Sequence, residues 1–227
     1  MDFYNDYSTP NKIDPSIFVN GLEHNKIVFI NGRIEKIEFN YEDDEKIEII
    51  DELEFKNNIN QENSLINLNN AFTNKYYKIV IKEGYFLKKP LIIYHTTNKN
   101  LKYKNINLRL DFLLEKNSYL KLIDIFSDAA EKNFINILYN FELGKDTILK
   151  NYKVDKKENS NVKYSFNNIN QDANSVSETF ILSAGSNFIK NEINCNLNGK
   201  YSSAFINGIF SLNEKRHHEI RTSINHL

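Results

Sequence analysis

The last fourteen residues, EKRHHEIRTSINHL, gather the side chains of this sequence that are best suited to acid–base or metal chemistry. They contain three of the five histidines, His217, His218 and His226, with Glu219 between them. Imidazole and carboxylate groups are common zinc ligands, and a structural zinc site takes four ligands. These residues would form a metal site only if the chain brings them to one point.

The spacing of these residues is typical of a strand, in which successive side chains point to opposite faces. One face has an apolar middle and is expected to point inward: His218, Ile220, Thr222, Ile224 and His226. The other face is wholly polar and is expected to point outward: His217, Glu219, Arg221, Ser223 and Asn225. Since a strand rises about 3.3 Å per residue, His218 and His226 would lie roughly 26 Å apart and could not share an ion.

We therefore expect no metal site in this strand. Glu219 and Arg221 are predicted to be neighbouring surface charges, and His226 is predicted to be a hydrogen-bonded structural residue. A metal held by His217 and Glu219, with ligands from elsewhere, is the alternative.

Other residues with reactive side chains are isolated in the sequence. Cys195, in INCNLNG, shares a strand face with apolar neighbours, which favours a buried small residue over a reactive thiol. Asp124 and Asp128 are too ordinary a pair to be assigned as an acid and a base, and His95 follows PLIIY at a strand end, where we expect no functional role. No glycine-rich phosphate loop, nucleophile elbow or HExxH motif is present. We expect no catalytic and no metal-binding residue and assign no cofactor-binding residue, and the chain is not an obvious NTPase or hydrolase.

The composition excludes several classes of protein. With 29 basic and 30 acidic residues, the net charge of −1 argues against a nucleic-acid-binding protein. No apolar run reaches the length of a membrane span, and the first residues do not have the pattern of a secretory signal. The single cysteine excludes a disulfide within the chain. We therefore predict a cytoplasmic protein without a nucleic-acid or membrane partner.

Most of the chain has the period-two apolar pattern of strands. Asn31-Gly32 between two apolar runs predicts a hairpin. Pro90 predicts a bend or an edge, because proline cannot donate to a central strand. The stretch SLINLNNAF, residues 64–72, is the one predicted helix, with Leu65, Leu68 and Phe72 on one face. The chain also has 37 asparagines, which look like a codon bias and predict mainly solvated loop residues.

Two interleaved repeats occupy the second half. One series of turn residues is Asn117, Gly144, Asn174 and Gly199, with spacings of 27, 30 and 25. The other is Asn133, Asn161 and Asn187, spaced 28 and 26, and one further step reaches Arg216. A common period of 25–30 residues indicates a stacked array of repeats. Repeats made only of strands predict a β-helix with two strands per coil.

The order of several motifs resembles the SufB/SufD family of iron–sulfur cluster assembly proteins. Gly208-Ile209-Phe210-Ser211-Leu212 fits a glycine-bearing strand motif of the family, and His217, Thr222 and His226 fall at the spacing of its following motif. The stretches NKIVFINGRI and LNNAFTNKYYKIVIKEGYFLKKPLIIYH resemble its N-terminal motifs in the same order. Glu219 and Arg216 depart from the usual Asp and Gln. The short region before the repeats suits SufD better than SufB.

The resemblance implies an all-β fold, a right-handed parallel β-helix with little helix. It implies a lead-in segment at 1–20 and a partial SufBD-like core at 21–227. It also implies a SufD-like subunit that is not an enzyme but a scaffold of a SufBCD-type complex, and that pairs with a SufB-like subunit through the β-helices. A SufC-type ATPase would bind through a C-terminal region that the family has after the position of Leu227. No catalytic or cluster-ligand residue of the family maps onto this sequence, so any iron–sulfur cluster would belong transiently to the assembled complex and not to this chain alone.

Two alternatives belong to other functional classes. A polysaccharide-acting β-helix enzyme would need paired carboxylates, or a carboxylate and a base, on one outer face. The sequence offers Glu219 and Arg221 on one strand but no second acidic cluster at matching repeat positions. A structural or binding β-solenoid without an assembly role is the other alternative.

Overall fold

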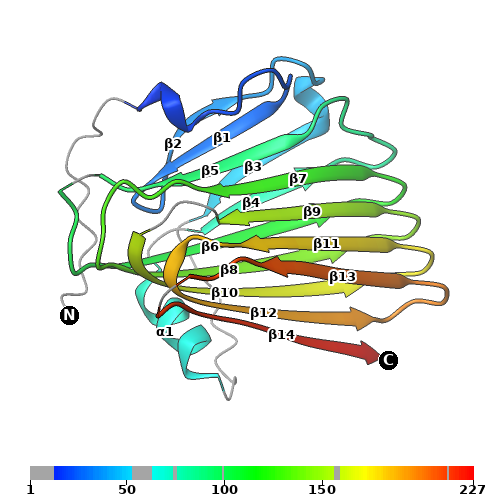
Figure 1. The fold of residues 1–227 in the computed structure, drawn as a ribbon. Helices are drawn as coiled ribbons and strands as arrows, with labels where there is room; N and C mark the ends of the chain where they lie inside the picture. Colours follow the sequence, from blue (N-terminus) through cyan, green and yellow to red (C-terminus); the bar gives the residue numbers. More distant parts are fainter. Residues whose placement is uncertain (1–12, 53–62, 74–75, 99, 156–158, 214) are drawn as a thin grey trace.

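The computed structural model of the chain describes residues 13–52, 63–73, 76–98, 100–155, 159–213 and 215–227. Two seven-stranded sheets, called sheet 1 and sheet 2 here, face each other across one interior (Figure 1). The strands of sheet 1 are β1 Asn25–Ile30, β2 Arg33–Glu38, β5 Leu91–Thr96, β7 Tyr119–Phe126, β9 Ile148–Asp155, β11 Val176–Ser183 and β13 Ser203–Phe210. Those of sheet 2 are β3 Ile47–Glu52, β4 Tyr76–Ile81, β6 Asn105–Leu114, β8 Phe134–Leu143, β10 Asn159–Gln171, β12 Ser186–Leu197 and β14 His217–His226.

From β4 onward, successive strands alternate between the two sheets, and from β6 onward each pairs in parallel with the strand two before it. One coil therefore contributes one strand to each sheet, and the coils stack from β1 and β2 at one end to β13 and β14 at the other (Figure 1). The predicted all-β parallel β-helix with little helix is confirmed. The helices of the described residues are α1 Ser64–Phe72 and two short 3₁₀ helices, Pro15–Ile17 and Asp44–Lys46.

The register confirms the second repeat series. The parallel pairs place Asn133, Asn161, Asn187 and Arg216 at equivalent positions of successive coils, one residue before the paired stretches of β8, β10, β12 and β14. The backbone N–H of Asn133 donates to the side-chain oxygen of Asn161 at 3.0 Å. These asparagines therefore link one coil to the next at the same corner.

The first repeat series was partly misaligned. The repeating turn residues with positive φ are Asn117, Asp146, Asn174 and Tyr201, and the Ser or Thr after each donates to the carbonyl three residues before it. Gly144 and Gly199 lie two residues before Asp146 and Tyr201. They are glycines because the backbone of the preceding coil comes too close for a Cβ, at 2.9 Å and 1.9 Å respectively.

Antiparallel strands form the N-terminal end of both sheets. β1 and β2 make the predicted hairpin, and both of its turn residues, Asn31 (φ 52) and Gly32 (φ 82), have the positive φ of a type I′ turn. β3 pairs antiparallel with β4 at the same end of sheet 2. Pro90 directly precedes β5, and its carbonyl accepts from the N–H of Asn25, so the predicted bend lies at a strand boundary.

The predicted helix has the predicted bounds. Its buried residues are Ile66 and Asn69, and Leu65 is partly buried beside Ile66. The amide nitrogen of Asn69 donates to the backbone carbonyls of Leu108 in β6, at 3.2 Å, and of Asn136 in β8, at 2.8 Å. A polar contact to the strand backbone, invisible in an apolar pattern, thus sets the rotation of the helix.

The outer face of sheet 2 carries an asparagine ladder. Side-chain amides of β10, β12 and β14 donate to amide or carboxylate oxygens of the neighbouring coil at 2.7–3.3 Å: Asn168 to Asn140, Asn194 to Asn168, Asn196 to Asn168 and Asn170, Asn225 to Asn194 and Asn196, and Asn170 to Glu142. Part of the asparagine excess is therefore structural and does not lie in solvated loops.

Candidate functional site

Strand β14 has the predicted alternation of faces. The ring of His218 points inward, with Nδ1 2.9 Å from the hydroxyl of Ser183 and Nε2 2.7 Å from the carbonyl of Ser186. The ring of His217 points outward and stacks on Phe188. His226, by contrast, is exposed, and within the described ranges its side chain has no hydrogen-bond partner, so the predicted structural role of His226 is wrong.

The charged side chains on the outer face of β14 form ion pairs with each other and with the neighbouring strand β12. Arg221 lies 3.5 Å from Glu219 and 3.6 Å from Glu192 of the neighbouring strand. Glu192 also accepts hydrogen bonds from the hydroxyl of Tyr164, at 2.5 Å, and from the side-chain amide of Asn63, at 2.8 Å. Asn63 caps α1. This carboxylate therefore anchors the helix to the sheet. No group of three or more His, Cys, Asp or Glu side chains able to hold a metal ion is found in the part of the chain that the structure describes.

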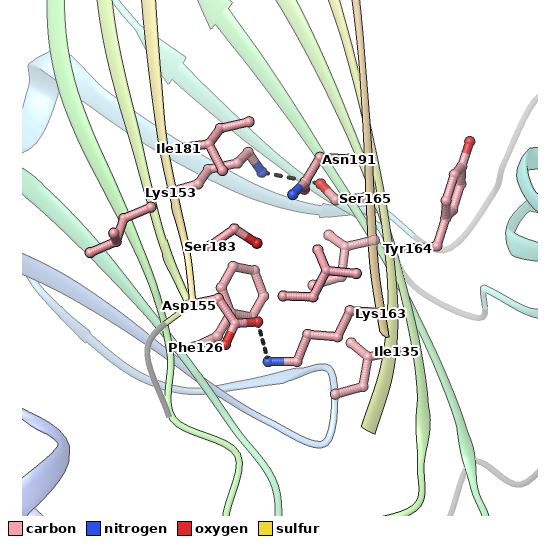
Figure 2. Close-up of a pocket in the computed structure, with 13 residues that line it drawn as sticks. Phe126, Ile135, Lys153, Asp155, Lys163, Tyr164, Ser165, Ile181, Ser183 and Asn191 are labelled. Atoms are coloured by element: carbon pink, nitrogen blue, oxygen red, sulfur yellow. Dashed lines mark hydrogen bonds and ion pairs between the residues drawn. The ribbon is translucent and has the colours of Figure 1, made fainter. Parts of the chain in front are cut away.

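A cluster of charged residues lies inside the β-helix and was not predicted. Its members are His95 of β5, Asp124 of β7, Asp128 of the connection after β7, Lys153 and Asp155 of β9, and Lys163 of β10, each at most 8% exposed. Figure 2 shows Lys153 reaching from sheet 1 to Ser165 of β10, and Lys163 reaching from sheet 2 to Asp155. The cluster thus bridges the two sheets.

One half of the cluster centres on Asp124. Its Oδ1 lies 3.3 Å from Nε2 of His95, and its Oδ2 lies 3.5 Å from Nζ of Lys153. The hydroxyl of Tyr139 lies 3.2 Å from the same histidine nitrogen, and the lysine amine lies over the tyrosine ring. Burial lowers the pKa of Lys153 to about 8, because the attraction of one carboxylate offsets only part of the cost of removing the ammonium from water.

The other half centres on Lys163. Its amine lies 2.6 Å from Oδ2 of Asp128 and 2.9 Å from Oδ2 of Asp155, and 4.8 Å from the ring centre of Phe126. The hydroxyl of Ser186 donates to Asp155 at 3.3 Å. Burial acts to lower the pKa of Lys163, but the two carboxylates outweigh burial, so this pKa lies above its ordinary value. The two lysines therefore differ because one has two carboxylate neighbours and the other has one.

The cavity beside the cluster is small. It has a volume of about 20 Å³ and is lined by both lysines, Asp155 and Ser165. A space of this size holds about one water molecule. The buried charges can exchange protons and tie strands together, but the cavity gives an organic substrate no room.

Lys153 gives the stability of the protein a pH dependence. The folded chain releases this proton near pH 8, whereas the unfolded chain holds it to about pH 10.5, so between these values the unfolded chain binds more protons and stability rises with pH. In urea titrations from pH 7 to 10.5, wild type should therefore gain stability relative to Lys153→Met above pH 8. The difference in free energy of unfolding between wild type and variant should rise by at most about 1.4 kcal/mol per pH unit. A stability difference that does not change over this range would contradict the prediction.

Cys195 is buried in the interior, as predicted. Burial raises the pKa of its thiol to about 11, although the hydroxyl of Ser177 acts to lower it. The thiolate is the nucleophile and metal ligand, so this cysteine is inert while the chain is folded.

The sequence contained one unused signal for the interior cluster. Lys153 and Asp155 share strand parity with Leu149, and Lys163 shares it with Ile169, so charged residues occupied positions of the inward face. Asp124 and Asp128 were considered as a pair, His95 was considered alone, and none of the three was assigned a role. Their partners come from strands 29 or more residues away, and only the coil register shows that they meet.

Comparison with known proteins gives one result. The family model described as SUF system FeS cluster assembly, SufBD core domain, matches residues 94–227, from within β5 to the end of β14. No curated protein matches the chain. No helix of the described ranges has the length and apolar character needed to cross a membrane.

Proposed function

Because the chain belongs to the SUF-system iron–sulfur cluster assembly family with the SufBD core domain, we propose that it is a SufD-like scaffold subunit of a SufBCD-type complex. It would support cluster formation in the cytoplasm together with a SufB-like subunit and a SufC-type ATPase, without being an enzyme itself. Family membership supports the involvement in cluster assembly. The scaffold role within the complex is the proposal.

The observation that carries the scaffold role is the state of the cysteine. These 227 residues contain one cysteine, and Cys195 is fully buried with a pKa of about 11. Sulfur transfer by a cysteine and iron binding through a cysteine both need an accessible thiolate. The described coils therefore favour a supporting role, in which the chemistry of the cluster takes place on other residues of the complex.

Exposed apolar side chains on β13 suit contact with another β-helix. Phe205 and Ile209 of this strand are 54% and 52% exposed. Apolar side chains that lie together on a surface favour contact with a second protein.

Co-purification tests this proposal. The tagged chain is co-expressed with the SufB-like and SufC-type proteins of the same organism, and the complex is measured by size exclusion with light scattering. We expect a stoichiometric complex with the SufB-like protein. Ile209→Lys on β13 should weaken the complex at least tenfold, whereas Ile37→Lys should leave it intact, because Ile37 is 45% exposed on β2 at the opposite edge of the same sheet.

Two outcomes would count against the proposal. A chain that stays monomeric in the presence of the SufB-like protein would contradict the scaffold role. Equal weakening by Ile209→Lys and Ile37→Lys would contradict the contact assigned to β13.

A further inference from the structure

Lys163 and its two carboxylate neighbours form a compact group in the buried interior. The side chains of Lys163, Asp128 and Asp155 are 6%, 2% and 10% exposed. The Lys163 amine lies 2.6 Å from Oδ2 of Asp128, a close contact without the angles of a regular hydrogen bond. The Lys163 contact with Asp155, by contrast, is a hydrogen bond of 2.9 Å.

We propose that Lys163 and Asp128 condense to an intramolecular amide, an isopeptide bond, with Asp155 carrying the protons. The bond that forms joins Nζ of Lys163 to Cγ of Asp128, and the bond that breaks is one C–O bond of Asp128. The ammonium gives two of its three protons to the departing oxygen through Asp155 and keeps the third as the amide N–H. One water molecule leaves, one positive and one negative charge disappear, and no other reactant is needed.

The interior favours this condensation in two ways. The fold holds amine and carboxyl group in contact, so the reaction has none of the entropic cost of bringing two molecules together. Two opposite charges inside the protein lose the hydration that they have in water, whereas an amide is neutral. The carboxylates hold Lys163 in its charged form, so the neutral amine arises through direct proton transfer to Asp155.

The surroundings of the two carboxylates distinguish Asp128, which forms the amide, from Asp155, which carries the protons. Asp155 accepts hydrogen bonds from Lys163 and from Ser186, which hold its carboxylate in place. Asp128 is the closer of the two and lies in the connection after β7, outside a strand ladder.

The other buried lysine is an internal control. Lys153 lies 3.5 Å from Asp124, and within the described residues no second carboxylate contacts its amine to carry protons. We therefore expect one linkage and not two. The linkage would join the connection after β7 to β10, across the intervening coil strands β8 and β9, as a covalent staple of the interior.

The intact mass of the full purified chain tests the proposal. After allowance for the initiator methionine, the wild-type protein should be lighter than its sequence mass by one water molecule. Tryptic digestion should give a branched peptide that joins residues 122–132 to residues 158–190. Lys163→Arg and Asp155→Asn should have their full sequence masses, since the first lacks the nucleophile and the second lacks the proton carrier.

Asp128→Asn identifies the acceptor, because an asparagine would release ammonia in place of water. A wild-type protein of full sequence mass in the soluble, folded fraction would overturn the proposal without any variant. So would a loss of one water that persists in Lys163→Arg, because the dehydration would then lie elsewhere. A branched peptide containing residues 154–156 would show that Asp155 is the acceptor and would overturn the assigned roles.

Discussion

Replacement of Asp124 by alanine is expected to lower the free energy of unfolding by about 3–5 kcal/mol. Asp124 is fully buried and contacts both His95, at 3.3 Å, and Lys153, at 3.5 Å. Its removal leaves the Lys153 amine in the interior with no carboxylate contact among the described residues. Either the ammonium stays there without compensation, or the lysine must be neutral when the protein folds. Urea denaturation at pH 7 measures the loss.

The double variant Asp124→Leu with Lys153→Met separates the effect of the unpaired lysine from the effect of lost side-chain packing. Replacing both members of a buried ion pair by apolar residues is often neutral or stabilising, so this variant should recover most of the loss. Asp111→Ala is the matched control, because Asp111 pairs with Arg109 at 3.0 Å on the partly exposed outer face of sheet 2. A surface pair contributes about 0–1 kcal/mol. A cost for Asp124→Ala as small as that for Asp111→Ala would contradict the importance of the buried pair.

The architecture could be predicted because its causes are local. Period-two alternation, the Asn31-Gly32 turn and the spacing from Asn133 to Arg216 each depend on a few neighbouring residues. Alternation also gave the correct faces of β14, because the inward row has an apolar middle and the outward row has none.

The ionic cluster could not be predicted because its contacts are remote. Lys163 meets Asp128, 35 residues earlier (163 − 128), only because the coil register stacks β10 over β8 and places the connection after β7 beside it. Alternation says that a side chain points inward, but not which side chain of the facing sheet it meets. The asparagine ladder was missed for the same reason, since a residue such as Asn168 looks like a solvated position until neighbouring coils align it with Asn140.

Gly199→Ala is expected to have the second large effect, a loss of about 3 kcal/mol or more in the free energy of unfolding. A Cβ at this position would lie 1.9 Å from the backbone nitrogen of Ala173 and 2.4 Å from the carbonyl carbon of Asp172. Both atoms belong to the turn of the preceding coil, so rotation of a side chain cannot relieve the clash. The two turns must separate, and the hydrogen bond from Gly199 N–H to the carbonyl of Gln171, 3.1 Å, would be stretched.

Two other glycines, Gly144 and Gly208, should lose less stability than Gly199 when replaced by alanine. At Gly144 the new Cβ would lie 2.9 Å from the carbonyl oxygen of Leu114, a milder backbone contact that should cost about 1–3 kcal/mol. At Gly208 it would lie 2.9 Å from Cδ1 of Ile220, a flexible side-chain end that can move, so Gly208→Ala should cost least. Thermal and urea denaturation of the three variants should give the order Gly199, Gly144, Gly208. If Gly199→Ala were no worse than Gly208→Ala, the close approach of successive turns would not limit the stacking of the coils. The glycines of the repeat would then have to be explained by their effect on the unfolded chain.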